Sequence, residues 1–276
     1  MRVIALSLMV LGAALSAQTP PASPASAPAP APQAPQGAGR GAPAPLPDLT
    51  CPDLAAALRA ASANDVRLRD WPAMARYRDA NRSAKDAKVV FMGDSITDNW
   101  QQPRFGGFFP GKAYVDRGIS GQTTPQMLLR FRNDVINLKP RAVVILAGTN
   151  DIAGNTGPMS DDDIEGNLAT MSELAHAHQI KVVLSSITPV SAYHLATPTA
   201  NPQTSQRPME RIRAINDWMK KYAADHGDIY LDYFSAMVDD KGLLRAELSG
   251  DDLHPTTAGY AIMGPLAEAA IAKAIK

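Results

Sequence analysis

The chain is poor in two things that often reveal a protein's class, cysteine and net charge. It has 276 residues with a single cysteine, Cys51, and 27 basic residues against 27 acidic ones. One cysteine excludes an intramolecular disulfide framework and any cysteine-rich zinc or iron–sulfur site. A net charge of zero argues against proteins that bind nucleic acid or anionic membranes, because both need a basic surface. A hydrophobic content of 45% is nevertheless enough to form a sizeable core.

The chain also lacks a hydrophobic run at its N-terminus that is long enough to cross a bilayer. The apolar run from Val3 to Leu15 is shorter than the ~20 residues that a spanning helix needs. A basic start before it and small residues after it predict a secretory signal peptide at 1–17, cleaved after Ala17. Leu15 is large for its position, so the exact bond stays open, and an uncleaved anchor is the alternative. No cysteine follows the run for lipid attachment, so we expect an exported protein, periplasmic or secreted, without stable membrane insertion after cleavage.

A second segment, 18–47, has no apolar pattern at all. It carries ten of the 23 prolines, mixed with alanine, serine and glutamine. Proline removes backbone donors and fixes φ, so we expect a disordered, solvated linker. The glycines inside it have no strand before them and no helix after them, which argues against a nucleotide-binding loop. The folded domain is therefore expected at 48–276.

From residue 48 onward, the pattern alternates between helices and short apolar strands. The strands are expected at 88–92, 113–116, 142–147, 181–187 and 229–231. The helices are expected at 54–61, 71–84, 124–138, 161–178, 209–226 and 256–276, with a long polar loop at 188–208. Such alternation predicts an α/β fold, with helices on both faces of a parallel sheet. Ligands bind such sheets at the carboxyl ends of the strands.

Two short polar clusters follow expected strands. Gly93 to Thr97 (GDSIT) comes after the strand at 88–92, where a tight turn would lift Ser95 toward the ligand crevice at the start of a helix. Its last residue is a threonine, unlike the second glycine of a G-x-S-x-G elbow, and a serine that merely caps the helix is the alternative. Gly148 to Asp151 (GTND) follows the most apolar strand. The Asn150 amide there can point at a developing oxyanion, with an ordinary turn as the alternative.

A third cluster, Asp251 to Pro255 (DDLHP), lies just before the last expected helix. An aspartate and a histidine three residues apart can meet in a turn, so that the Asp251 carboxylate orients one ring nitrogen of His254. The other nitrogen is then free to take a proton from a serine. The alternative is a purely structural histidine.

Taken together, the three clusters and Arg117 to Thr124 (RGISGQTT) resemble the SGNH, or GDSL-type, hydrolases in order and spacing. The resemblance extends from about Trp71 to the C-terminus. It implies a three-layer α/β/α sandwich on a five-stranded parallel sheet, a flavodoxin-like arrangement. It also implies that the protein is a carboxylic ester hydrolase that needs neither a metal nor an organic cofactor.

The resemblance further assigns roles to individual residues. Ser95 would be the nucleophile, His254 its base and Asp251 the residue that orients His254. The backbone N–H groups of Ser95 and Gly121, with the side-chain amide of Asn150, would form the oxyanion hole. No catalytic position is substituted, which argues against an inactive relative.

Other signals are weaker. The acidic run at 161–163 lacks a calcium ligand at the twelfth loop position, so a charged helix start is the better interpretation. His176 and His178 would face different directions on a helix, and His194 in the polar loop could touch substrate or lie on the surface. Phe105, Phe108 and Phe109 are expected to pack under a loop, with a place in the wall of the pocket as the alternative. Trp100, Arg130 and Arg132 give no distinct signal.

The polar loop at 188–208 has no apolar run that would hold a long acyl chain. We therefore expect an exported serine esterase for short acyl groups, acetyl above all, on a carbohydrate or similar polar alcohol, with a small-molecule or glycan ester as its partner. A short-chain lipase, lysophospholipase or thioesterase is one alternative, and an acyltransferase is another. A non-catalytic binding module for acylated envelope glycan is the alternative of a different class. The oligomeric state stays open.

Overall fold

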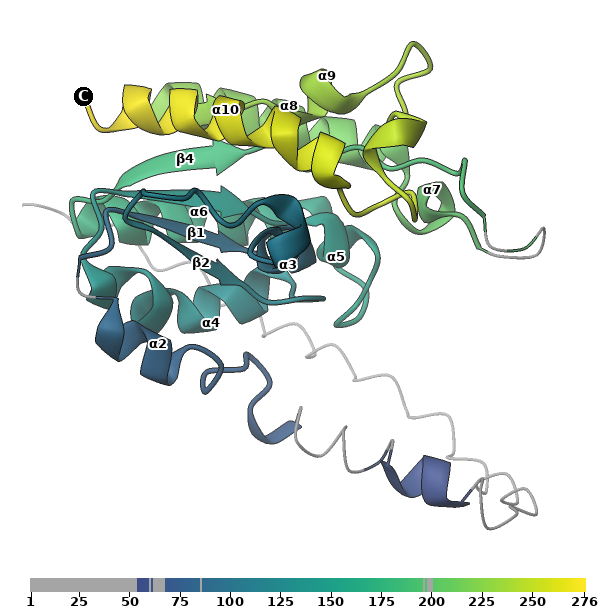
Figure 1. Ribbon diagram of the computed structural model, residues 1–276, viewed down its shortest axis with the longest axis horizontal. Coiled ribbons are helices and arrows are strands. Elements are labelled where there is room, and N and C mark those ends of the chain that lie inside the picture. The colour runs from purple at the N-terminus through teal and green to yellow at the C-terminus, as the bar shows by residue number, and fades with distance from the viewer. Residues whose placement is uncertain (1–53, 60, 62–67, 85, 196, 198–200) are drawn as a thin grey trace, which may run out of the picture. The chain divides into compact units, whose positions relative to one another are not determined.

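The computed structural model describes residues 54–59, 61, 68–84, 86–195, 197 and 201–276 (Figure 1). The expected signal peptide, the linker and Cys51 lie outside these residues. Residues 51–276 form one compact unit. At its centre is a five-stranded parallel sheet in the order β2-β1-β3-β4-β5. The strands are β1 (Val89–Gly93), β2 (Tyr114–Gly118), β3 (Ala142–Leu146), β4 (Lys181–Ser185) and β5 (Ile229–Leu231).

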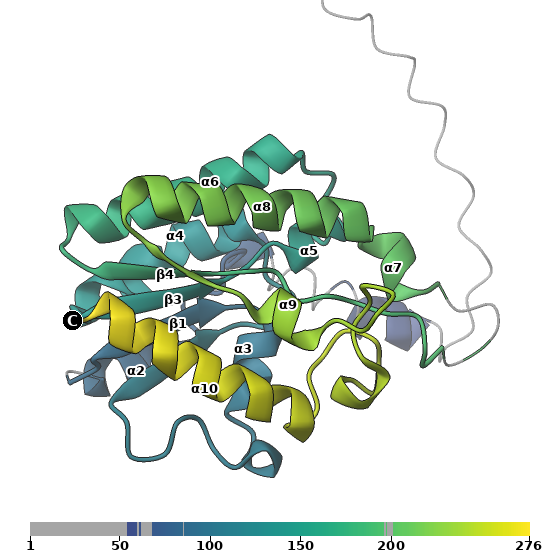
Figure 2. The same ribbon diagram turned by 90° about the horizontal axis from the view of Figure 1, so that it is seen from above.

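Helices connect the strands and cover both faces of the sheet. A helix at 54–59 comes first in the described part of the chain. The later α-helices are α2 (Arg78–Ser83), α3 (Ser95–Trp100), α4 (Thr124–Asp134), α5 (Thr149–Ile152), α6 (Asp161–Ala177), α7 (Gln203–Gln206), α8 (Met209–His226), α9 (Tyr233–Met237) and α10 (Thr257–Ala274). Figure 2 shows α6 and α8 on one side of the strands and α10 on the other. The predicted three-layer α/β/α fold is confirmed.

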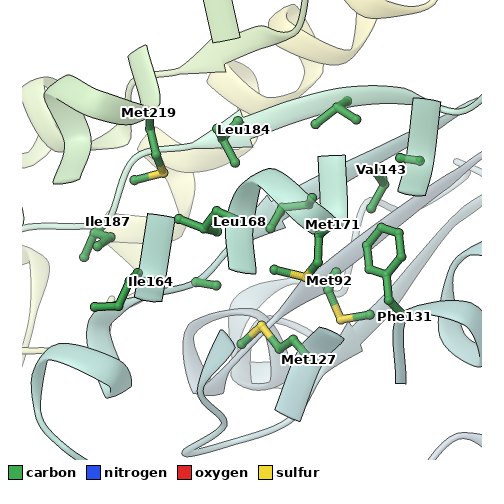
Figure 3. Packing of buried hydrophobic residues seen from close by; sticks show 14 of the residues in the cluster. Met92, Met127, Phe131, Val143, Ile164, Leu168, Met171, Leu184, Ile187 and Met219 are labelled. Carbon is green, nitrogen blue, oxygen red and sulfur yellow. The ribbon is translucent and has the colours of Figure 1, made fainter. Parts of the chain in front are cut away.

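Two hydrophobic clusters, one on each face of the sheet, form the core. Successive strand residues point to opposite faces, so Val90 and Met92 of β1 join the cluster under α4, α6 and α8, whereas Phe91 joins the cluster under α3 and α10. Figure 3 shows the first cluster, in which Met92 lies near Phe131 of α4 and Met171 of α6. Every residue of β1 and β3 is buried. Burial on both faces explains their uninterrupted apolar sequences.

Aromatic rings dominate the second cluster. Phe108 and Phe109 pack against Phe91, each with ring centroids 5.0 Å apart, which confirms the packing predicted for them. Trp100 is buried in the same cluster, and the centroid of its ring lies 4.8 Å from that of Tyr260 in α10. This cluster fixes α3 against α10, and these two helices carry or flank the polar clusters of the sequence.

The prediction of a helix at 71–84 is wrong for the first half of that range, because only the second half, α2, is helical. The carboxylate of Asp70 accepts hydrogen bonds from the backbone N–H groups of Met74 (2.8 Å) and Ala75 (2.9 Å). Ala73 has a φ of +55°, which an α-helix does not allow. The segment 70–77 is therefore a series of turns, and alanine content misled the prediction.

Two further boundaries differ from expectation. The helix expected at 124–138 ends at Asp134 and continues as a 3₁₀ turn at Ile136–Leu138, because Val135 leaves the helical backbone with φ −124° and ψ −66°. The loop expected at 188–208 contains the short helix α7, and α9 was not predicted. All three short elements lie within connections, where the apolar period is too brief to detect.

Candidate active site

Ser95 is the first residue of α3, and only Asp94 separates it from the inner strand β1. Asp94 caps the helix by accepting the N–H of Ile96 at 2.9 Å. A Cβ at Gly93 would collide with the side chain of Thr97, so the turn between strand and helix requires glycine there. Ser95 is 8% exposed, which leaves only its site-facing edge accessible.

The loop before α10 brings His254 to Ser95. His254 Nε2 lies 2.9 Å from Ser95 Oγ, and His254 Nδ1 lies 2.6 Å from Asp251 Oδ2. The other carboxylate oxygen, Asp251 Oδ1, accepts the backbone N–H groups of His254 (2.7 Å) and Leu253 (3.1 Å). The structure thus brings together three side chains separated by up to 159 residues.

The electrostatics of these three hydrogen-bonded side chains suit the transfer of a proton. Partial burial acts to raise the pKa of Asp251, but the hydrogen bonds from the side chain and backbone of His254 outweigh it and hold that pKa well below its usual range. An ionised Asp251 accepts a hydrogen from Nδ1 of His254. Nε2 is then left as an acceptor facing the Ser95 hydroxyl. This geometry permits Ser95 to give its proton to His254 as it attacks an acyl carbon.

The three residues predicted to bind an oxyanion follow three adjacent strands of the sheet. Gly121, with a φ of +80°, lies in the loop after β2, and Asn150 lies in α5 after β3. The Asn150 Nδ2 group donates one hydrogen to the Gln122 carbonyl at 3.0 Å, which fixes the amide and leaves its second hydrogen available. In the described part of the chain, the backbone N–H groups of Ser95 and Gly121 donate to no other group. The predicted roles of these residues stay predictions.

Gly148 makes the turn before Asn150 possible. Its φ is +116°, and a Cβ there would lie 2.7 Å from Ile187 Cδ1. Glycine is the residue that adopts this backbone without strain. The turn delivers Thr149 and Asn150 directly to the carboxyl end of β3.

Arg130 gave no signal in the sequence, yet it links two of the site's loops. Its side chain is fully buried in α4. The guanidinium donates to Gln122 Oε1 (2.5 Å), to the Gly93 carbonyl (3.1 Å) and to Asp134 Oδ2 (3.0 Å). It therefore ties the turn before Ser95 to the loop of Gly121.

Arg207 is a second residue that sequence reasoning missed. It follows α7 in the connection expected to be a polar loop, and it is buried. Its Nε donates to Thr149 Oγ1 at 3.0 Å, and its Nη2 lies 3.5 Å from Asn150 Oδ1. Burial lowers the pKa of Arg207, whereas the nearby carboxylates Asp94 and Asp251 oppose that effect. Arg207 thus holds α5 from the side opposite to Gln122.

His194 lies outside the Ser95–His254–Asp251 chain. Its Nδ1 is 3.1 Å from Asp252 Oδ1, and its backbone N–H donates to Asp252 Oδ2 at 2.8 Å. Asp252 also accepts the hydroxyl of Ser191 at 2.6 Å. These bonds fasten the connection after β4 to the loop that carries Asp251 and His254, so His194 acts as an anchor in this structure.

The acidic run and His176 have structural roles. Ser160 and Asp163 form a reciprocal capping box at the start of α6, as a charged helix start predicts. His176 Nε2 pairs with Asp228 Oδ1 at 2.6 Å, next to the amino end of β5. Over the described residues, no group of three or more potential ligands is arranged to hold a metal ion.

A titrating carboxyl next to Ser95 gives a testable pH dependence. Burial raises the pKa of Asp94 from 3.8 to about 6, and its Oδ2 has no hydrogen-bond partner. The Asp94 carboxyl therefore binds its proton more tightly in the folded protein than in the unfolded chain. Stability from this group is fully present below pH 4 and is lost as the pH rises through 6. We expect the Asp94→Asn variant, which keeps an N-cap oxygen, to gain up to about 3 kcal/mol relative to wild type between pH 4 and pH 8.

Urea unfolding at the two pH values measures this difference. Asp162→Asn, on the exposed first turn of α6, is the control and should show the same small offset from wild type at both pH values. An Asp94→Asn offset that does not change between pH 4 and pH 8 would contradict the assignment.

Comparison with known proteins identifies the family. The model of the GDSL-like lipase/acylhydrolase family matches residues 91–262. The chain belongs to this family. A GDSL-like lipase from Bacteroides thetaiotaomicron, known from its crystal structure, is 40% identical with a TM-score of 0.65, over 74% of this chain and 98% of that one. This GDSL-like acylhydrolase is therefore a carboxylic ester hydrolase, as predicted.

Two curated proteins are also similar to the acylhydrolase. An acetylxylan esterase from Geobacillus stearothermophilus is 28% identical over 204 residues, which cover 64% of this chain and 90% of that protein. A lipoprotein from Bacillus subtilis is 37% identical over 79 residues, which cover 28% of this chain and 32% of that protein. The second match therefore spans about a third of its relative's length.

Proposed function

We propose that this acylhydrolase is a serine esterase with Ser95 as nucleophile, His254 as general base and acid, and Asp251 as the residue that orients His254. The observation that carries the proposal is the continuous chain from Ser95 Oγ to His254 Nε2 (2.9 Å) and from His254 Nδ1 to Asp251 Oδ2 (2.6 Å). Both distances suit hydrogen bonds along which a proton moves.

The reaction proceeds in two halves. Ser95 Oγ attacks the ester carbonyl while His254 takes its proton, and the oxyanion is stabilised by the N–H groups of Ser95 and Gly121 and by the Asn150 amide. Collapse expels the alcohol, which receives the proton from His254, and leaves an acyl-serine. Water then attacks the acyl carbon, His254 takes the water's proton and returns it to Ser95 Oγ, and the carboxylic acid departs.

The proposed substrate is a short acyl ester, acetyl above all, of a carbohydrate or similar polar alcohol. A hollow of about 310 Å³ opens beside His254 and is lined by polar groups that include Arg104, Thr256 and Thr257, with Phe105 as an apolar wall. In the reaction above, the leaving alcohol lies on the His254 side. Hydroxyl and guanidinium groups there suit an alcohol with further hydroxyls, and the similarity to an acetylxylan esterase agrees with this.

We further propose that the protein is exported. The support is the signal-like sequence at 1–17 and the partial similarity to a lipoprotein. In the part of the chain that the structure describes, no helix has both the length and the apolar character to cross a bilayer. N-terminal sequencing of the protein from the exported fraction tests the proposal, and an intact Met1 there would count against cleavage.

Esterase activity against p-nitrophenyl acetate, butyrate and octanoate tests the substrate class. We expect kcat/KM to fall at least tenfold from the acetyl to the octanoyl ester, because the residues that line the hollow at His254 are mostly polar and offer a long acyl chain little apolar surface beyond Phe105 and Pro255. Release of p-nitrophenol from the purified protein is the measurement. A preference for octanoate would favour the lipase alternative. Folded protein that hydrolyses none of the three would favour the non-catalytic binding module.

A further inference from the structure

A second and larger hollow lies beside the loop of Gly121. Its volume is about 480 Å³, and its walls come from four places: residues 70–73, the loop of Gly121 itself (119–122), the start of α4, and the turn after α5. Gly121 lines it, so a molecule bound there would lie next to one of the proposed oxyanion donors. Neither Ser95 nor His254 lines it, and the hollow is therefore separate from the one beside His254.

Trp71 is the aromatic wall of this hollow, and it is 40% exposed. Its backbone is held firmly: Gln126 Nε2 donates to the Trp71 carbonyl at 2.7 Å, and Gln122 Nε2 donates to the Pro72 carbonyl at 2.7 Å. Both glutamines belong to the chain that follows Gly121. Trp71 therefore lies at a fixed position relative to the loop of Gly121, and part of its side chain is open to solvent.

The remaining lining is mostly polar, with Ala73 and Ile119 as apolar members, and carries no positive charge. Ser120, Asn155 and Thr156 supply hydroxyl and amide groups, and Asp70 and Gln126 lie beside Trp71. Neither lysine nor arginine is among the residues that line this hollow, which disfavours a phosphate or another anionic headgroup. A partly exposed indole with hydroxyl, amide and carboxylate groups around it matches a sugar ring, which has an apolar C–H face and a hydroxylated edge.

We propose that the Trp71 hollow is a subsite for a pyranose ring of an oligosaccharide whose acyl group reacts at Ser95. This rests on the proposed esterase function, which it extends by adding a site for a sugar unit beyond the acylated one. Trp71 lies outside residues 91–262 that match the family. The loop of Gly121, Gln126, Asn155 and Thr156, which also line the hollow, lie inside that range.

Binding of unacylated sugars tests the subsite without any turnover. Xylotetraose and chitotetraose are added separately to the Ser95→Ala protein, and the dissociation constant is measured by calorimetry and tryptophan fluorescence. Trp100 is buried and Trp218 stacks on Tyr222, so Trp71 is the open reporter among the described tryptophans. We expect millimolar or tighter binding of at least one sugar. Trp71→Ala on this background should weaken it at least tenfold, and Trp71→Phe should weaken it less.

The matched control is Leu68→Ala on the same Ser95→Ala background. Leu68 lies shortly before Trp71 in the sequence and is 80% exposed, but it does not line the hollow. Its replacement should leave the dissociation constant within twofold. Failure of both sugars to bind, or equal affinity in the Trp71→Ala protein, would overturn the subsite. Preference for one sugar over the other identifies which ring the hollow accepts.

Kinetics separate failure of the subsite from failure of the esterase proposal. For each protein with Ser95 intact, kcat/KM is measured on acetylated xylo-oligosaccharide and on p-nitrophenyl acetate, and the ratio is taken. We expect Trp71→Ala to lower this ratio at least tenfold, mainly through KM for the oligosaccharide, and Leu68→Ala to keep it. An unchanged ratio with active enzyme overturns the subsite alone. No hydrolysis of p-nitrophenyl acetate by wild type overturns the esterase proposal, while the sugar-binding test still stands.

Discussion

Ser95→Ala is expected to lower kcat/KM on p-nitrophenyl acetate by at least about 10⁴-fold, because it removes the hydroxyl that we propose forms the acyl intermediate. The side chain is small and sits at the first turn of α3, where Asp94 and not Ser95 provides the cap. The melting temperature should therefore stay close to that of wild type. Ser83→Ala, at the exposed end of α2, is the matched control and should keep full activity.

A double substitution tests whether the three side chains act as one unit. Since His254 serves the reaction through Ser95 Oγ, Ser95→Ala with His254→Ala should be hardly slower than Ser95→Ala alone. If the two residues contributed independently, the rate losses of the two single variants would instead multiply in the double variant. A Ser95→Ala protein that retains more than a tenth of wild-type activity would show that another residue is the nucleophile.

The residues proposed for catalysis could be predicted because each one follows a local signal. Ser95 and Asn150 come directly after the two most buried strands, and Asp251 and His254 share one short loop before a helix. In a parallel sheet the carboxyl ends of adjacent strands meet, so local position in the sequence implies closeness in space. His254 does not follow a strand, so its contact with Ser95, across 159 residues, is not given by that rule; the resemblance to the SGNH hydrolases predicted it.

Residues that hold the site from outside could not be found in the same way. Arg207 is in a connection without periodicity, and its partners Thr149 and Asn150 lie 57 to 58 residues away in the sequence. The segment around Trp71 has the composition of a helix, but tertiary bonds to the carbonyls of Trp71 and Pro72 replace helical ones. In both cases a contact distant in the sequence overrides the local pattern, and only the folded structure reveals it.

Arg130→Met is expected to cause the largest loss of stability, about 3–5 kcal/mol in the free energy of unfolding. The substitution keeps an unbranched apolar stem but removes the guanidinium. The carboxylate of Asp134, which is also buried, is then left with Asn81 as its remaining side-chain partner. The Gly93 carbonyl and the side chain of Gln122 also lose a donor, and these are the groups that position Ser95 and Gly121.

Urea unfolding of Arg130→Met and Arg132→Met separates this effect from the loss of any arginine on α4. Arg132 is exposed on the same helix, and its replacement should change stability by less than about 0.5 kcal/mol. Arg130→Lys keeps the charge, but one ammonium cannot reproduce the planar guanidinium that reaches three acceptors. We expect it to recover part of the stability and to remain slower than wild type in kcat, because the two loops are no longer tied in register. An Arg130→Met protein within 1 kcal/mol of wild type would show that Gly93 and Gln122 are held by the sheet and α4 alone.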